Sequence, residues 1–148
     1  MSGTTNAACM FYGCSNLKSI NLNNFDTSNV ENMRYMFSGC SSLMNLDLSS
    51  LDTTKVSDMC SMFEGCNNLI GLELSGLTTS NVERMDYMFW NCSSLTNLDI
   101  SGFDTSRVKN MGGMFSGCSG LTRLDIDGFN TNNVLDMGSV FWNCSSLT

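Results

Sequence analysis

The chain has 148 residues, of which 42% are hydrophobic and 14% charged, and this composition suits one folded domain rather than a disordered segment. Its net charge of −7 counts against nucleic acid as a partner, and the absence of histidine removes the usual base of a Ser or Cys nucleophile. No apolar run approaches the ~20 residues of a membrane span, and the first residues carry neither the basic nor the apolar region of an export signal.

A 26-residue repeat runs through the whole chain without an insertion. A fixed period of this length is typical of a solenoid, in which each repeat forms one coil. We therefore predict a single solenoid over residues 1–148, with about five and a half coils and a core of recurring Val, Met, Phe and Leu side chains. The phenylalanine column shows the regularity: Phe11, Phe37, Phe63, Phe89, Phe115 and Phe141.

The first element of each repeat is predicted to be a short helix. Val56, Met59, Met62 and Phe63 recur at i, i+3, i+6 and i+7, which is one face of a helix of about two turns. Good N-cap residues precede it: Ser28, Thr54, Ser80, Ser106 and Asn132. The helices are expected near residues 4–12, 29–38, 55–64, 81–90, 107–116 and 133–142.

A corner follows each predicted helix. Gly or Asn occupies its first position, and these residues most readily adopt the left-handed conformation that ends a helix. A cysteine comes next, which we interpret as a buried free thiol that fills the bend. A ladder of disulfides between coils is the alternative, whereas zinc is disfavoured because a line of thiols supplies no tetrahedron. The structural residues of these corners are Gly39, Cys40, Gly65, Cys66, Asn91, Cys92, Gly117 and Cys118.

Two further cysteines lie outside this column. Cys60 aligns with Arg34, Asp86 and Gly112, which predicts an outward position. Cys9 and Cys60 are better candidates for a reactive thiol than the regular six, although inert surface thiols are the main interpretation.

The second element is predicted to be a short strand. An L-x-x-L-x-L frame alternates apolar and polar residues near 17–22, 43–48, 69–74, 95–100 and 121–126, and stacked copies would form a parallel sheet. Side chains between the leucines are expected to face solvent. They are the candidate binding residues: Asn21, Asn45, Asp47, Glu73, Asn97, Asp99, Arg123, Asp125 and Asp127. The acidic members either keep the sheet soluble, bind a cationic partner, or bind calcium.

A turn leads back to the next predicted helix. Asp26, Asp52 and Asp104 are each followed by threonine, and such side chains bond to nearby backbone amides. A turn role is therefore the main interpretation. A rank of threonine hydroxyls facing water, as in ice-binding solenoids, is a weaker alternative.

The string LTNLDISGFDTSRVKNMGGMFSGCSGL (95–121) and its copies resemble the BspA-like repeats of microbial surface proteins, and the frame is similar to a leucine-rich repeat. The resemblance covers essentially the whole chain. It implies an α/β, leucine-rich-repeat-like right-handed solenoid, with parallel strands on one face and short helices on the other. It also implies an extracellular or cell-surface location and a role in adhesion or other protein binding.

Function is expected to be non-catalytic, because the sequence shows no paired carboxylates in a cleft, no phosphate loop and no metal set. We expect a repeat scaffold that binds a protein or cell-surface ligand through the acidic strand face, without cofactor or membrane insertion. The alternative is structural self-assembly into a homo-oligomer or fibre, by end-to-end stacking of open solenoid ends. A third hypothesis is calcium binding along the acidic columns.

Overall fold

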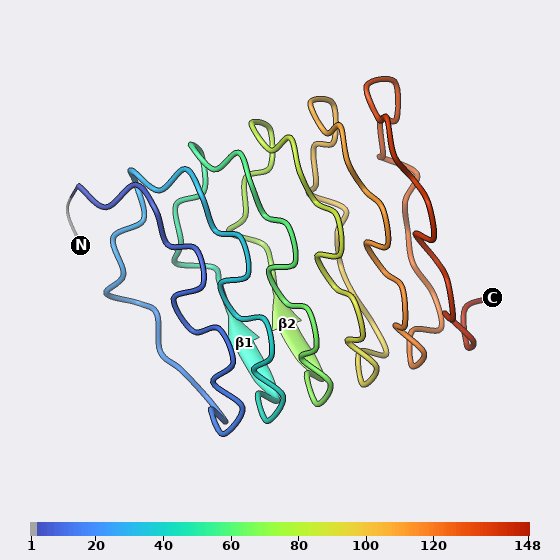
Figure 1. The fold of residues 1–148 in the computed structure, drawn as a ribbon, viewed down its shortest axis with the longest axis horizontal. Helices are drawn as coiled ribbons and strands as arrows, with labels where there is room; N and C mark the ends of the chain where they lie inside the picture. Colours follow the sequence, from blue (N-terminus) through green and yellow to red (C-terminus); the bar gives the residue numbers. More distant parts are fainter. Residues whose placement is uncertain (1–2) are drawn as a thin grey trace.

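The chain forms a stack of flattened coils in a computed structural model that describes residues 3–148 (Figure 1). Parallel bridges join residues 26 positions apart through the whole stack, from Asn6–Asn32 to Asn110–Asp136. One coil therefore corresponds to one sequence repeat, and the termini lie at opposite ends of the stack.

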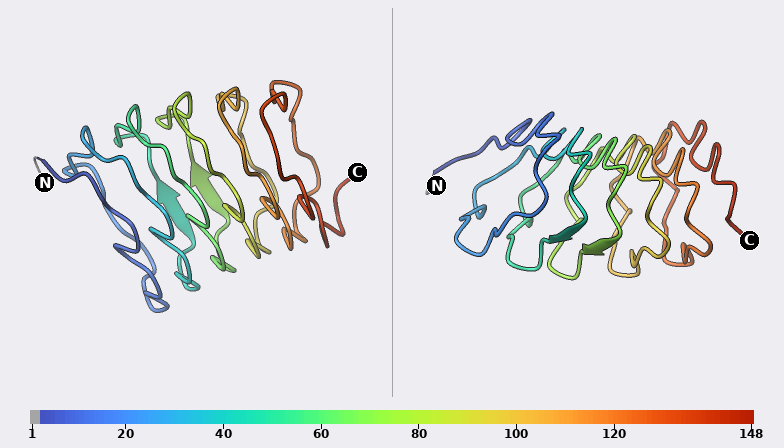
Figure 2. Two further views of the ribbon diagram at one scale, coloured as in Figure 1. Left: turned by 45° about the horizontal axis from the view of Figure 1, so that its top comes forward. Right: turned by 90° about the horizontal axis from the view of Figure 1, so that it is seen from below.

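The expectation of an α/β, leucine-rich-repeat-like solenoid with strands on one face and helices on the other is wrong. The described residues contain no helix, and hence none long and apolar enough to cross a membrane. They contain two strands, β1 (Asn45–Asp47) and β2 (Gly71–Glu73), which pair in parallel with Leu46 opposite Leu72. Figure 2 shows β1 and β2 along one side of the stack, with a zigzag backbone along the other.

The zigzag replaces the predicted helices because its backbone bonds mostly to the next coil. The N–H groups of Met33, Tyr35, Phe37 and Gly39 donate to carbonyls 25 residues later, at 2.7–3.0 Å. The N–H groups of Met36 and Ser38 donate to the carbonyl three residues earlier rather than four, and the Arg34 N–H donates to Asn32 Oδ1. We call residues 32–40 and their copies in the other coils the bridged segments.

A left-handed residue in each bridged segment prevents an α-helix. Tyr35, Ser61 and Tyr87 have φ of 57°, 55° and 57°, and Gly113 has 61° at the equivalent position. A right-handed helix cannot continue through such a residue. The predicted N-cap residues consequently cap nothing: the Ser28 hydroxyl instead donates to the Asp26 carboxylate, at 2.6 Å.

The sheet is also smaller than expected. β1 and β2 lie within two of the predicted strand ranges, whereas 17–22, 95–100 and 121–126 contain no strand among the described residues. Few backbone hydrogen bonds link the coils on this side. The bond from Thr122 N–H to the Thr96 carbonyl, 3.5 Å long, is the one that joins 95–100 to 121–126. A continuous ladder would need such bonds at alternate residues.

The core follows the repeat columns, as predicted. The Val, Met, Phe and Leu side chains of the middle coils are buried in one continuous cluster. Phenylalanine rings from successive coils stack at its centre, with centroids 5.2–6.1 Å apart and nearly parallel planes. In the last coil the same columns are less covered, and Met137 and Phe141 are 49% and 39% exposed.

The threonine turn is confirmed, and it has an additional role between coils. Thr53 Oγ1 donates to the carbonyl of Thr78 in the next coil and accepts from the N–H of the same residue, at 2.9 and 2.8 Å. Thr27, Thr79 and Thr105 make the same pair of bonds. These hydroxyls are buried, so the alternative in which they face water as an ice-binding rank is wrong.

The glycine–cysteine corners have the predicted left-handed backbone, although they end no helix. Gly39 and Asn91 have φ of 74° and 57°. All eight cysteines are free thiols, and those at the corners of the middle coils are fully buried. From the second coil onward, each corner thiol donates to a phenylalanine carbonyl of the preceding coil, as Cys66 Sγ does to Phe37 at 3.2 Å.

Candidate binding face

The nine candidate binding residues are brought to one side of the stack, and every one of their side chains is exposed. Asn45 and Asp47 come from β1 and Glu73 from β2, while the others occupy equivalent positions in coils without a strand. We call this surface the strand face. Its acidic column consists of Asp47, Glu73, Asp99 and Asp125.

The acidic column has a structural role that the sequence analysis missed. Each of its side chains accepts a hydrogen bond from the backbone N–H two residues later, as Asp47 does from Ser49 at 2.9 Å and Glu73 from Ser75 at 2.8 Å. Asp99 and Asp125 do the same. The Ser101 hydroxyl also donates to Asp99, and these bonds lower the pKa of that carboxyl. The carboxylates are therefore held in one orientation by the backbone.

An open groove of about 670 Å³ lies along β1 and β2. Asp47 and Glu73 contribute its charged lining, together with Asn45, the side chain of Ile20 from the preceding coil and apolar atoms of Leu72. A smaller hollow of about 310 Å³ continues from Glu73 to Asp99. The strand face thus combines carboxylates with an accessible depression.

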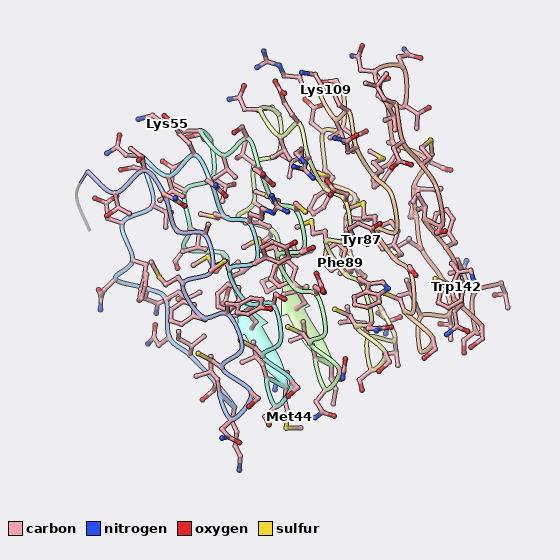
Figure 3. All side chains as sticks on the ribbon, in the orientation of Figure 1. Met44, Lys55, Tyr87, Phe89, Lys109 and Trp142 are labelled. Atoms are coloured by element: carbon pink, nitrogen blue, oxygen red, sulfur yellow. The ribbon has the colours of Figure 1, made fainter. Side chains whose placement is uncertain are left out.

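The carboxylates of this face are not neutralised within residues 3–148. The two salt bridges of that part lie elsewhere, between Arg84 and Asp86 and between Lys109 and Glu83. Lys55 and Lys109 lie along one edge of the stack, at the end opposite Met44 (Figure 3). No three acidic or cysteine side chains of the described chain are close enough to hold a metal ion. The calcium hypothesis therefore has no preformed site.

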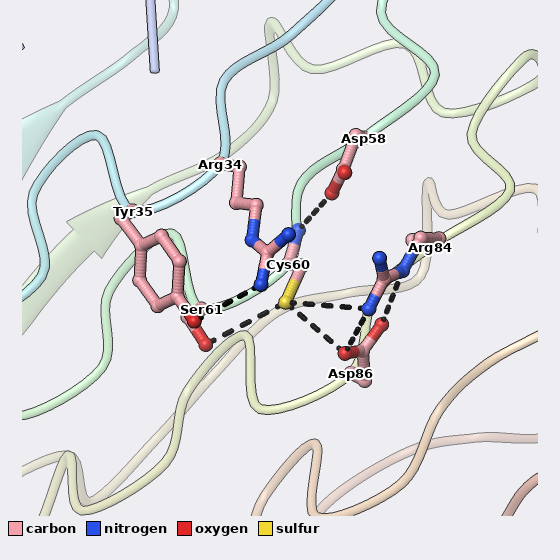
Figure 4. A network of polar contacts seen from close by, with 7 residues as sticks. All are labelled: Arg34, Tyr35, Asp58, Cys60, Ser61, Arg84 and Asp86. Atoms are coloured by element: carbon pink, nitrogen blue, oxygen red, sulfur yellow. Dashed lines mark hydrogen bonds and ion pairs between the residues drawn. The ribbon is translucent and has the colours of Figure 1, made fainter. Parts of the chain in front are cut away.

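Cys60 was expected to point outward, and that expectation is wrong. It is only 1% exposed, because Arg34 and Asp86 occupy the equivalent positions of the two adjacent coils and cover it (Figure 4). Its thiol donates to Asp86 Oδ2 at 3.0 Å, and Arg84 binds both oxygens of that carboxylate at 2.8 and 3.1 Å.

This cluster suppresses thiol chemistry. Burial, assisted by the bond to Asp86, raises the pKa of Cys60 to about 11. Burial acts to raise the pKa of Asp86 as well, but hydrogen bonds from Arg84 and Cys60 outweigh it and leave the pKa below its usual value. Burial likewise raises the pKa of Cys66 and of Cys118 to about 12. These thiols remain protonated at neutral pH and are poor nucleophiles.

Another hollow, away from the strand face, lies on the bridged segments and was not predicted from the sequence. Tyr35, Ser61, Glu64, Tyr87 and Trp90 line about 240 Å³. Its signal is present in the repeat: the column of Tyr35, Ser61 and Tyr87 holds aromatic residues in some coils and small residues in others.

The family profile described as "Mycoplasma protein of unknown function, DUF285" matches residues 1–73 and again residues 67–148. No protein with a curated description matches the chain. The two matches together cover the whole sequence, and the 26-residue coils of the fold extend through both. The chain therefore belongs to the family described as Mycoplasma protein of unknown function, DUF285.

Proposed function

We propose that the protein is a non-catalytic scaffold that binds a positively charged protein or cell-surface ligand through the strand face. The acidic column carries this proposal: Asp47, Glu73, Asp99 and Asp125 present one exposed carboxylate on each of four successive coils, and none of them forms a salt bridge with another residue of 3–148. Carboxylates stacked at this spacing repel one another, so a basic partner gains energy by relieving that repulsion.

The geometry favours an extended basic segment that runs along the stack. Alternate side chains of an extended chain lie about 6.6 Å apart. Asp47 and Glu73 are paired across β1 and β2, whose backbones lie about 4.8 Å apart, so long and flexible Lys or Arg side chains at alternate positions would reach successive carboxylates. Because hydrogen bonds to backbone amides already hold these carboxylates, little side-chain entropy is lost on binding.

The proposed setting is the cell surface, and the proposed role there is adhesion. The similarity of the repeat to those of BspA-like microbial surface proteins supports this setting. The buried thiols support a non-catalytic role, because their raised pKa values leave them protonated.

Charge neutralisation that keeps the turns intact tests the proposal. The variant D47N/E73Q/D99N/D125N removes four charges, while the new amide oxygens can still accept the backbone bonds; Asn21 already does so in the first coil, at 2.9 Å. The matched control, D26N/E31Q/D52N/D104N, removes four charges at the other edge, and Asn130 shows that Asn fits the aspartate position there.

Binding would be measured to immobilised polylysine and to a panel of extracellular-matrix proteins. We expect the strand-face variant to lose at least ~10-fold in affinity and the control to lose much less. Equal losses would mean that net charge alone drives binding. Unchanged binding by the strand-face variant would show that this is the wrong face.

Self-assembly is a second candidate function, because the two ends of the stack have complementary unpaired backbone groups. Within residues 3–148, the N–H groups of Met137, Ser139, Phe141 and Asn143 have no acceptor. In the first coil, the carbonyls of Asn6, Ala8, Met10 and Tyr12 have no donor. These are the donors and acceptors that join coils inside the stack, so a second copy could continue the ladder head to tail. Light scattering after size-exclusion chromatography at several concentrations tests this: a monomer at every concentration would overturn it.

A further inference from the structure

We propose that the hollow on the bridged segments binds a quaternary ammonium group, such as that of choline. Tyr35, Tyr87 and Trp90 supply its aromatic walls, Ser61 its floor and Glu64 its carboxylate. Aromatic rings around a cation, with a nearby carboxylate, are the usual means of recognising methylated ammonium groups. This site is on the opposite side of each coil from the strand face and is independent of the function proposed above.

The placement of these residues follows from the repeat. Tyr35, Ser61 and Tyr87 are equivalent positions in three successive coils, so the small Ser61 leaves a gap between two tyrosines. Glu64 belongs to the same coil as Ser61, and Trp90 to the same coil as Tyr87. The carboxylate therefore lies at the level of the gap, with aromatic residues one coil before and one coil after it.

A cation in the hollow would be attracted by the aromatic rings that line it, because cation–π attraction is effective within about 6 Å of a ring centroid. The hollow of about 240 Å³ is large enough for a trimethylammonium group but open on one side.

The charges around the hollow also favour a cation. Glu64 is part-exposed and forms no salt bridge within the described chain. Arg84 is already neutralised by Asp86. Arg34 is not among the residues that line the hollow; its guanidinium lies over the Tyr35 ring, with Cζ 4.8 Å from the centroid. That pair shows that this ring attracts a cation within the chain itself.

A quaternary ammonium fits better than a metal ion or a simple ammonium. The hollow offers one carboxylate and no group of three acidic or cysteine ligands, which a metal ion would require. A primary ammonium has three donors that need acceptors, whereas a methylated one has none and presents apolar methyl groups to the rings.

The test titrates the full chain with tetramethylammonium, choline and trimethyllysine, and with 3,3-dimethyl-1-butanol as the uncharged isostere of choline. Trp142→Ser leaves Trp90 as the only tryptophan, so its fluorescence reports on the hollow. Serine is the natural residue at the equivalent positions 38 and 116. We expect a saturable change in the millimolar range with the cations and none with the isostere. Tighter binding of choline would identify a choline headgroup as the natural ligand, and tighter binding of trimethyllysine would identify a methylated lysine side chain.

Ligand-detected NMR then compares variants without relying on tryptophan. Trp90→Ser and Tyr87→Ser copy residues of other coils, and Glu64→Gln removes only the charge. Each should weaken binding at least ~5-fold while the melting temperature is retained, and Trp142→Ser is the matched control with unchanged affinity. Equal binding of the isostere, no saturation by any cation, or unchanged affinity in all three variants would overturn the proposal.

Discussion

Replacing one buried threonine hydroxyl should weaken the stack by a predictable amount. Thr79 Oγ1 donates to the Asp104 carbonyl at 3.0 Å and accepts from the Asp104 N–H at 2.8 Å, and its side chain is 1% exposed. Thr79→Val keeps the shape of the side chain but removes both bonds. Each contributes about 1 kcal/mol net, so we expect a loss of about 2 kcal/mol in the free energy of unfolding.

The last coil offers a matched control. Thr131 occupies the same column but is exposed, and no coil follows it in the described part of the chain. Thr131→Val should therefore change the free energy of unfolding by less than ~0.5 kcal/mol. Thr79→Ser keeps the hydroxyl and should recover most of the loss.

Denaturant and thermal unfolding followed by circular dichroism measure these differences. A loss of about 2 kcal/mol corresponds to a fall of roughly 4–8 °C in melting temperature for a domain of this size. If Thr79→Val is as stable as the wild type, the hydroxyl does not join the coils. If Thr131→Val is destabilised equally, the effect comes from valine in the turn and not from contact with the next coil.

Three further predictions concern the core, the thiols and the acidic column. Phe63→Ala should lower the free energy of unfolding by about 3–5 kcal/mol, because this fully buried ring stacks on a phenylalanine ring on each side. Phe141→Ala should lower it clearly less, because Phe141 is 39% exposed; denaturant unfolding curves measure both variants. With a thiol reagent at pH 8, the exposed Cys9 and Cys14 should react fast and the buried thiols slowly until denaturant is added; fast reaction of all eight would contradict the burial. The pKa of Asp99 is lowered in the folded state, so its stabilising effect is present at neutral pH and is lost as the pH falls through the acid range; Asp99→Asn should reduce this loss in an acid titration of stability.

The helix prediction failed for a specific physical reason. Val56, Met59, Met62 and Phe63 have helical spacing, but turns of three residues bury the same side chains. An α-helix and the bridged segment differ in the backbone conformation of Ser61, whose φ is 55°. Five of the six residues at the positions equivalent to Ser61 are not glycine, so their residue types did not predict a left-handed backbone.

The candidate site was predicted in part. Alternation around the leucines placed all nine candidate residues on one exposed face, although most of that face has no regular strand. The hydrogen bonds of the acidic column were missed, even though Asn21 and Asp47 have the residue types that form such turns. The ammonium hollow was missed because it depends on which coils carry a small residue between two aromatic ones.

The 26-residue coil, the buried columns, the left-handed corners and the threonine turns follow from the residue types, because each depends on one kind of residue at a fixed position. The choice between helix and bridged backbone does not, since it depends on whether an N–H group such as that of Phe37 bonds within its own segment or to Met62 in the next coil. The same applies to Cys60, which is buried by side chains of adjacent coils 26 residues away on each side. Stacking brings these partners together, and nothing in a single repeat encodes them.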